Sequence, residues 1–171
     1  MRSNERTPEG AAARLTVLAL LADGDFGVTE IGLLERLRAF DVLAIGRSEF
    51  LDVAAAFCTE LRGDAPAREA RPYLSVDAHR IRRLLARIDD PATRRAIACL
   101  ILQIVRADGR ICAGESLLLW EMLDAWDLRL ADVAALTLGA GAPGVLPRAP
   151  RMSRRPPRVA GPRHAIGAPA I

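Results

Sequence analysis

A short acidic motif occurs twice in this chain, each time between two stretches whose apolar residues recur at helical spacing. Asp23 begins an Asp-Gly pair and is followed by Glu30, and Asp108 and Glu115 repeat the pattern at the same offset. A glycine after the aspartate favours the left-handed backbone that ends a helix. A glutamate in the first turn of the next helix is favourable there. The repeat predicts two helical hairpins in an all-α fold with an internal pseudo-two-fold axis.

Apolar periodicity extends this prediction to about seven helices, and no segment shows the alternation typical of strands. The expected helices run from Pro8 to Ala22, from Val28 to Phe40, from a cap at Ser48 to Leu61, from a cap at Ser75 or Asp77 to Ile88, from Pro91 to Ala107, from near Glu115 past Met122, and from Leu128 to Leu138. A loop containing Gly63, Pro66 and Pro72 divides the two halves.

Two local features sharpen these boundaries. Thr7 precedes Pro8 and Asp90 precedes Pro91, which are typical pairs of an N-cap and a first helical residue. The stretch 96–105 is apolar on nearly every side. A helix of that kind is expected in the middle of a bundle.

The length of 171 residues indicates one domain, expected at 7–138, followed by a tail at 139–171. The tail is rich in Pro, Gly and Arg, so it is expected to be disordered. Its six arginines have no acidic neighbours, and since the whole chain carries +3, residues 1–138 carry −3. The tail suggests salt-sensitive contact with nucleic acid, although it lacks interleaved aromatic residues; an unstructured extension is the alternative.

The cysteine content and the apolar runs bear on the compartment. Cys58, Cys99 and Cys112 are an odd number without metal-ligand spacing, as expected in a reducing cytoplasm. The N-terminus does not resemble a secretory signal. The longest apolar run, 96–105, is shorter than the roughly 20 residues that span a bilayer. A cytoplasmic protein without a membrane span is therefore expected.

The acidic motifs allow two interpretations. In the first, the two turns form one acidic surface that binds a divalent cation such as calcium, magnesium or manganese, since these ions prefer carboxylate and carbonyl oxygens. The candidate metal ligands are Asp23, Asp25, Glu30, Asp108 and Glu115. The alternating oxygen positions of an EF-hand loop are missing, and Arg110 stands where the second copy would repeat Asp25.

In the second interpretation the same residues only cap helices. Glu30 and Glu115 lie three residues after the expected N-cap positions, Gly27 and Cys112. A carboxylate at that position reaches back to the N–H of the cap residue in a capping box. A turn that binds no metal would therefore select the same glutamates, and the chain would act as a protein-interaction scaffold.

The duplicated motif resembles the TerB-like tellurite-resistance family. The resemblance covers about residues 11–138 and is carried by Ala22-Asp23-Gly24 with Glu30 and by Ala107-Asp108-Gly109-Arg110-Ile111 with Glu115. It implies an all-α bundle of about seven helices, a divalent-metal site at the acidic turns, and a role in stress or tellurite response. A similar module occurs in some DnaJ-like co-chaperones, although this chain has no His-Pro-Asp motif.

No constellation in the sequence predicts an enzyme. The chain has two histidines, His79 and His164, and no nucleophile, phosphate-loop or dinucleotide motif. Cys112 lies beside an acidic turn and is interpreted as a partly buried thiol. The arginines between His79 and Arg87 suggest either a solvated polar face or a phosphate-contacting one. A non-enzymatic module with an unidentified protein partner is therefore expected.

Overall fold

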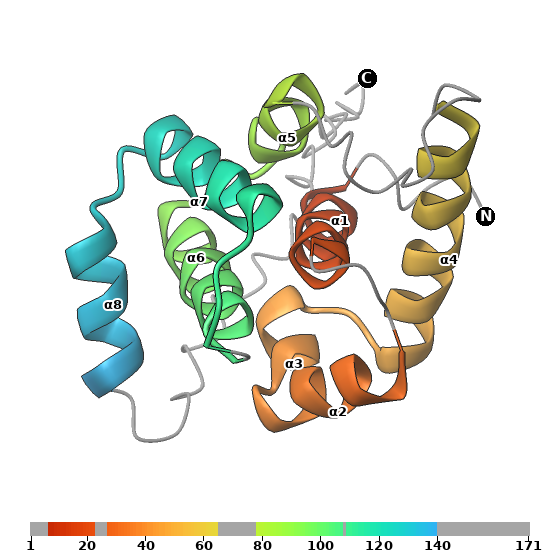
Figure 1. The fold of residues 1–171 in the computed structure, drawn as a ribbon, viewed down its shortest axis with the longest axis horizontal. Coiled ribbons are helices and arrows are strands. Elements are labelled where there is room, and N and C mark those ends of the chain that lie inside the picture. The colour runs from red at the N-terminus through yellow and green to blue at the C-terminus, as the bar shows by residue number, and fades with distance from the viewer. Residues whose placement is uncertain (1–6, 23–26, 65–77, 108, 140–171) are drawn as a thin grey trace, which may run out of the picture.

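The computed structural model describes residues 7–22, 27–64, 78–107 and 109–139, and within these ranges it contains helices and no strand (Figure 1). The helices of the described ranges are α1 (Pro8–Leu21), α2 (Val28–Arg36), α3 (Ala39–Leu43), α4 (Arg47–Asp64), α5 (Ala78–Leu85), α6 (Pro91–Val105), α7 (Ala113–Ala125) and α8 (Leu130–Gly139). The all-α fold is confirmed, with eight helices in these ranges instead of about seven.

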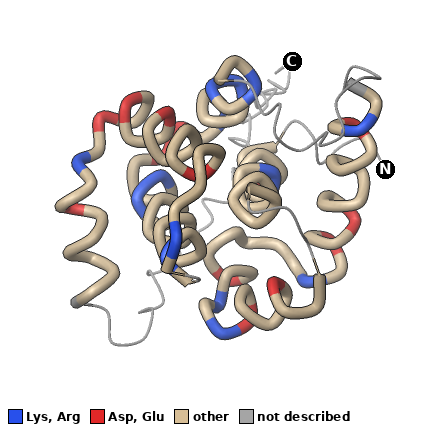
Figure 2. The backbone as a smooth tube through the Cα atoms, viewed as in Figure 1, with Lys and Arg blue, Asp and Glu red and all other residues tan. Residues whose placement is uncertain are grey.

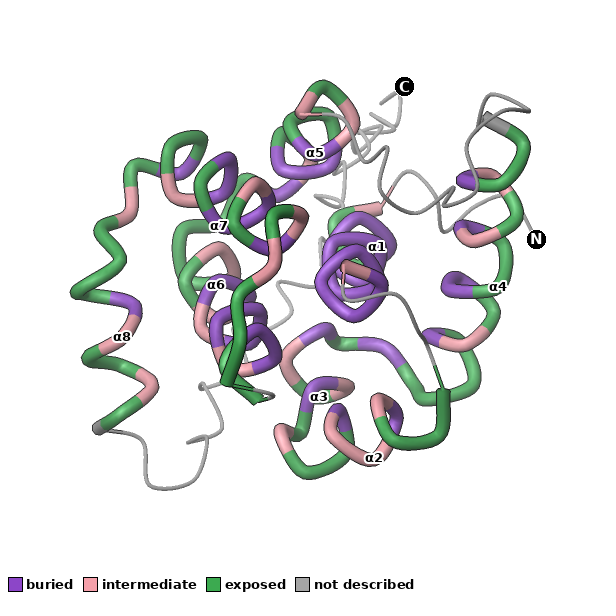
Figure 3. The backbone as a smooth tube through the Cα atoms, in the orientation of Figure 1, coloured by how far each residue is buried: buried purple, intermediate pink, exposed green. Residues whose placement is uncertain are grey.

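Helix α1 is the central element of the bundle. Every residue from Gly10 to Leu21 is buried, and α1 contacts α3, α4, α5, α6 and α7 (Figure 3). The predicted start is confirmed, since Pro8 is the first helical residue and the Thr7 hydroxyl accepts a hydrogen bond of 3.1 Å from the Gly10 N–H. Alanines at 11–13 allow neighbouring helices to approach closely.

Helix α6 was expected in the middle of the bundle because of its apolar sequence. Seven of its residues are buried, and it packs against α1, α3, α7 and α8, but it is less enclosed than α1. The central position of α1 is not evident from its sequence, because the helix contains polar residues. The Thr16 hydroxyl donates to the Ala12 carbonyl at 2.9 Å, and Arg14 forms an ion pair with Glu60. Because these groups have partners inside the fold, α1 can be buried without being uniformly apolar.

The second expected helix, Val28 to Phe40, is wrong in its C-terminal part. Helix α2 ends at Arg36, and Arg38 adopts a left-handed conformation with φ 52° that separates α2 from the short helix α3. The Arg38 side chain forms an ion pair of 2.8 Å with Asp41 across this break. A non-glycine residue at positive φ leaves no clear signal in the sequence, so the break was missed.

Helix α4 begins before the predicted cap. Arg47 is its first residue, and the Phe50 N–H donates to the Gly46 carbonyl at 2.9 Å, so Ser48 lies inside the helix and does not cap it. The predicted caps Ser75 and Asp77, most of the loop from Gly63 to Pro72, and the tail from residue 140 onward lie outside the described residues.

The second half of the chain packs α5 on α7 and α8 on α6. Asp90 caps α6 as predicted, accepting a hydrogen bond of 2.7 Å from the Thr93 N–H. The buried indole of Trp126 donates to the Leu85 carbonyl at 3.3 Å and joins the ends of α7 and α5. Over the described ranges, the helices are too short or too polar to cross a bilayer.

Candidate functional site

The end of α1 and the beginning of α7 meet at one place, although 90 residues separate them in the sequence. The Cys112 thiol, at the N-cap of α7, donates to the carbonyl oxygen of Ala22, the C-cap of α1, at 3.2 Å. A Cβ atom added to Gly114 would lie 3.4 Å from the Ala22 Cβ. Figure 1 shows the N-terminal end of α7 beside α1. We call this contact, made by Ala22, Cys112 and Gly114, the corner.

Glycine at position 114 permits the approach. Ala22 lies against its backbone, so a Cβ atom at this position would already be in van der Waals contact with the Ala22 side chain. Gly109 serves the turn that precedes the corner: its φ of +74° is the left-handed conformation predicted for the Asp-Gly turn. The corresponding glycine of the first copy, Gly24, lies outside the described residues.

Both candidate glutamates act as helix caps. The Glu30 Oε2 accepts a hydrogen bond of 2.7 Å from the Gly27 N–H, and the Glu115 Oε2 accepts one of 2.7 Å from the Cys112 N–H. The two copies therefore use the glutamate in the same way, as the capping interpretation of the motif expects. Cys112 completes the second box by accepting from the Glu115 N–H at 3.4 Å, whereas Gly27 has no side chain to do so.

The environments of the two glutamates differ. Glu115 is 4% exposed, while Glu30 is partly exposed at the start of α2. A carboxylate has two oxygens, and the capping bond of each glutamate uses Oε2, which leaves Oε1 for a further partner. The geometry of the caps is therefore compatible with cation binding but does not require it.

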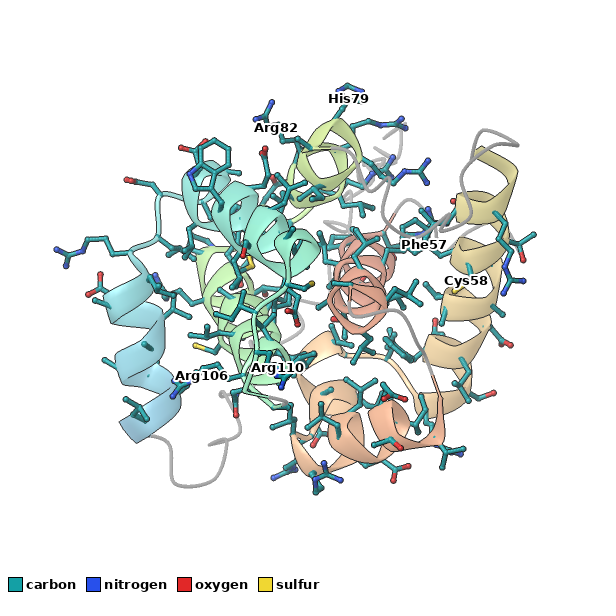
Figure 4. All side chains as sticks on the ribbon, in the orientation of Figure 1. Phe57, Cys58, His79, Arg82, Arg106 and Arg110 are labelled. Atoms are coloured by element: carbon teal, nitrogen blue, oxygen red, sulfur yellow. The ribbon has the colours of Figure 1, made fainter. Side chains whose placement is uncertain are left out.

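The remaining candidate ligands, Asp23, Asp25 and Asp108, lie outside the described residues. Within the ranges that are described, no three Asp, Glu, His or Cys side chains gather closely enough to hold a metal ion. Two arginines belong to the second copy: Arg106 caps the end of α6 and Arg110 follows Gly109 (Figure 4). Their positive charge opposes cation binding at this turn more than at the turn of the first copy.

The three cysteines are partly buried, whereas His79 is exposed. Cys58 and Cys99 pack against the core, and burial raises the pKa of each thiol, with Arg62 opposing that rise at Cys58. Cys112 is partly buried, as interpreted. His79 is exposed on α5 (Figure 4).

The ion pairs that join α5 to α7 and α1 to α4 were not predicted from the sequence. Arg82 of α5 holds the buried Glu121 of α7 through two hydrogen bonds of 2.5 and 2.8 Å, and Arg14 of α1 holds Glu60 of α4 through two of 2.9 and 3.1 Å. Figure 2 shows basic residues on α5 and acidic residues on α7. The position of Glu121 inside the apolar run of α7 was the available signal, since an acid there needs a partner.

Comparison with known proteins identified no relative of the chain, since no protein-family model, no curated protein and no solved structure matches it.

Proposed function

We propose that this chain is a non-enzymatic, TerB-like stress-response module that binds a divalent cation at the acidic turns beside the corner. The observation that supports the proposal is the hydrogen bond from the Cys112 thiol to the Ala22 carbonyl. Asp23 is the next residue after Ala22, and Asp108 precedes Cys112 by four positions. The contact therefore joins the C-cap of α1, the residue before Asp23, to the N-cap of α7, whose first turn carries Glu115.

The chemistry of the proposed ligands suits calcium, magnesium or manganese. The candidates offer carboxylate oxygens only, and hard divalent cations prefer such donors. Glu30 and Glu115 would contribute Oε1 while Oε2 keeps its capping bond. The aspartates of the turns would supply the remaining negative charge, with more from the first copy, because Asp25 is replaced by Arg110 in the second.

Terbium titration tests this proposal on the full chain. Trp120 is 58% exposed and lies five residues after Glu115, so it can sensitise terbium bound near the corner. We expect a saturable luminescence signal that calcium displaces and that Asp23→Asn combined with Asp108→Asn reduces at least tenfold in affinity. Asp52→Asn, an exposed acid on α4, is the matched control and should leave the affinity unchanged. Titration without a calcium-competable signal would reject cation binding.

A second candidate function is a protein-interaction scaffold in which the acidic turns only cap helices. The capping bonds of Glu30 and Glu115, both 2.7 Å, favour it, because they account for both glutamates without a metal. Glu30→Gln separates the two candidates, since glutamine retains a capping oxygen but loses the charge. The variant should weaken cation binding if the turns bind a metal, and it should leave the cap intact if they act only as caps. The scaffold predicts that calcium leaves the thermal midpoint unchanged and that Glu30→Ala lowers stability by roughly 0.5–2 kcal/mol, the range for a lost cap.

A further inference from the structure

A hollow of about 250 Å³ lies between α1, α4 and α5, and arginines dominate its walls. Arg14 comes from α1, and Arg80, Arg83 and Arg87 come from α5 and the turn after it, while Glu60 of α4 is the one acidic residue among the described lining residues. These residues together carry three more positive than negative charges. The hollow is positively charged and the acidic turns are negatively charged, so the two cannot bind the same ligand.

Helical geometry explains why two arginines of α5 line the hollow. Arg80 and Arg83 are three residues apart, which places them on one side of α5, and Arg87 follows in the turn after the helix. Arg82 lies on the other side, where it holds Glu121 of α7. The arginines between His79 and Arg87 are therefore divided between a structural ion pair and the wall of a cavity.

Two of the lining arginines are held in place by the fold. Arg14 is only 8% exposed, and both of its terminal nitrogens donate to the Glu60 carboxylate, at 2.9 and 3.1 Å. Its guanidinium lies 5.0 Å from the centre of the buried Phe57 ring, and that of Arg80 lies 6.0 Å from it. Cation–π contact at these distances orients both guanidinium groups. Figure 4 shows Phe57 on α4, facing α1. The positive side of the hollow is thus partly preorganised.

We propose that this hollow binds a phosphate group, either as the free ion or as the phosphomonoester of a small metabolite. Planar guanidinium groups match the oxygens of a phosphate in pairs, and arginine is favoured at such sites. Arg80 and Arg83 are like charges three residues apart on α5, a spacing at which they repel each other, so a bound dianion would be favourable beside them. The volume of about 250 Å³ lies just below the range of roughly 300–1,000 Å³ typical of drug-sized ligands, which indicates a small ligand.

Calorimetric titration of the full chain with inorganic phosphate tests the proposal, with chloride keeping the ionic strength constant. We expect saturable one-to-one binding that Arg83→Gln combined with Arg87→Gln weakens at least tenfold. Arg83 is exposed and Arg87 is half-buried, so neither belongs to the core and the double variant should fold; its circular dichroism spectrum checks this. Arg95→Gln, at an exposed position in the N-terminal part of α6, is the matched control and should change the affinity less than twofold.

Glycerol phosphate, titrated in parallel, distinguishes the two sources of the phosphate group: tighter binding than phosphate indicates a phosphomonoester, and weaker binding indicates the free ion. Amide resonances of α1, α4 and α5 should shift on binding, while those of α8 should not. Binding that the arginine-rich tail causes would be equal in all variants and would overturn the proposal, as would the absence of saturable binding.

Discussion

At the residue scale, the contact between α5 and α7 depends on one buried side chain, that of Glu121. Its side chain is 2% exposed within the apolar face of α7, and Arg82 holds it from a position that is 57% exposed. Taking a carboxylate out of water is unfavourable unless its partner remains. The contact between α5 and α7 therefore requires a specific charge pair in addition to apolar packing.

Arg82→Ala should lower the free energy of unfolding by about 1–3 kcal/mol, because it leaves the buried Glu121 carboxylate without its guanidinium partner. Urea denaturation followed by circular dichroism measures the change. Arg83→Ala, one residue further along the same helix, is the control and should change stability by less than about 0.5 kcal/mol. Equal losses in the two variants would show that the ion pair does not stabilise the fold.

Asp90 offers a prediction about pH at the same scale. Its carboxylate accepts hydrogen bonds from the hydroxyl and the N–H of Thr93, at 2.6 and 2.7 Å, and these bonds lower the pKa of Asp90, the hydroxyl most. The folded pKa is below the unfolded one, so the carboxylate stabilises the fold above the unfolded pKa. This stabilisation is lost as the pH falls through the folded pKa. The difference in thermal midpoint between the unaltered protein and Asp90→Ala should therefore be constant near neutral pH and shrink below about pH 4.

The control for Asp90 is Thr93→Val, which removes the hydroxyl donor. In that background Asp90→Ala should change the thermal midpoint less at neutral pH, because the folded pKa lies nearer its ordinary value. A difference that widens as the pH falls would contradict the assignment of Asp90 as an ionised cap.

At the scale of the element, the least regular helix boundaries are those of α3. This helix begins after Arg38 at φ 52° and ends at Ala44 at φ 55°, so two residues with side chains adopt the left-handed conformation that favours glycine. A left-handed residue with a side chain is unfavourable by roughly 1–2 kcal/mol. Packing of the buried Ala39 and Leu43 of α3 must offset that strain.

Ala44→Gly should therefore raise the free energy of unfolding by about 0.5–1 kcal/mol, because glycine adopts this backbone without strain. Chemical denaturation measures the gain. Ala56→Gly, at an exposed position in the middle of α4, should instead lower stability by about 0.8–1 kcal/mol. An Ala44→Gly variant as destabilised as Ala56→Gly would contradict the left-handed conformation of Ala44 at the end of α3.

The sequence predicted regular helices better than their interruptions. The starts of α1 and α6 follow from a capping residue before proline, and both are confirmed. The predictions of an unbroken helix through Arg38 and of a cap at Ser48 were wrong for different reasons. At Arg38 tertiary packing imposes a backbone that arginine does not prefer. At Ser48 a good capping side chain lies one residue inside a helix that begins at Arg47.

At the scale of the whole molecule, the fold depends on contacts between segments that are distant in the sequence. The repeated motif predicted that two similar turns exist, and both glutamates cap their helices alike. It did not predict that α1 would be the central helix or that arginines from α1 and α5 would line one hollow. Such features depend on which helices become neighbours, and apolar periodicity within one helix carries no information about its partners.

The central claim is that the end of α1 and the start of α7 meet at the corner, and an engineered disulfide tests it most directly. The Cβ atoms of residues 22 and 114 would lie 3.4 Å apart, close to the 3.5–4.5 Å of disulfides. The test protein carries Ala22→Cys and Gly114→Cys, with Cys112→Ser and with Cys58 and Cys99 replaced by alanine. The control protein carries Ser116→Cys in place of Gly114→Cys and is otherwise the same.

Mass spectrometry after mild oxidation of the native protein gives the result. The account predicts rapid and nearly complete formation of the bond between residues 22 and 114, with little bond formation between 22 and 116. Slow cross-linking that is equal in the two proteins, or that occurs only after denaturation, would contradict the corner and remove the structural support for a cation site there.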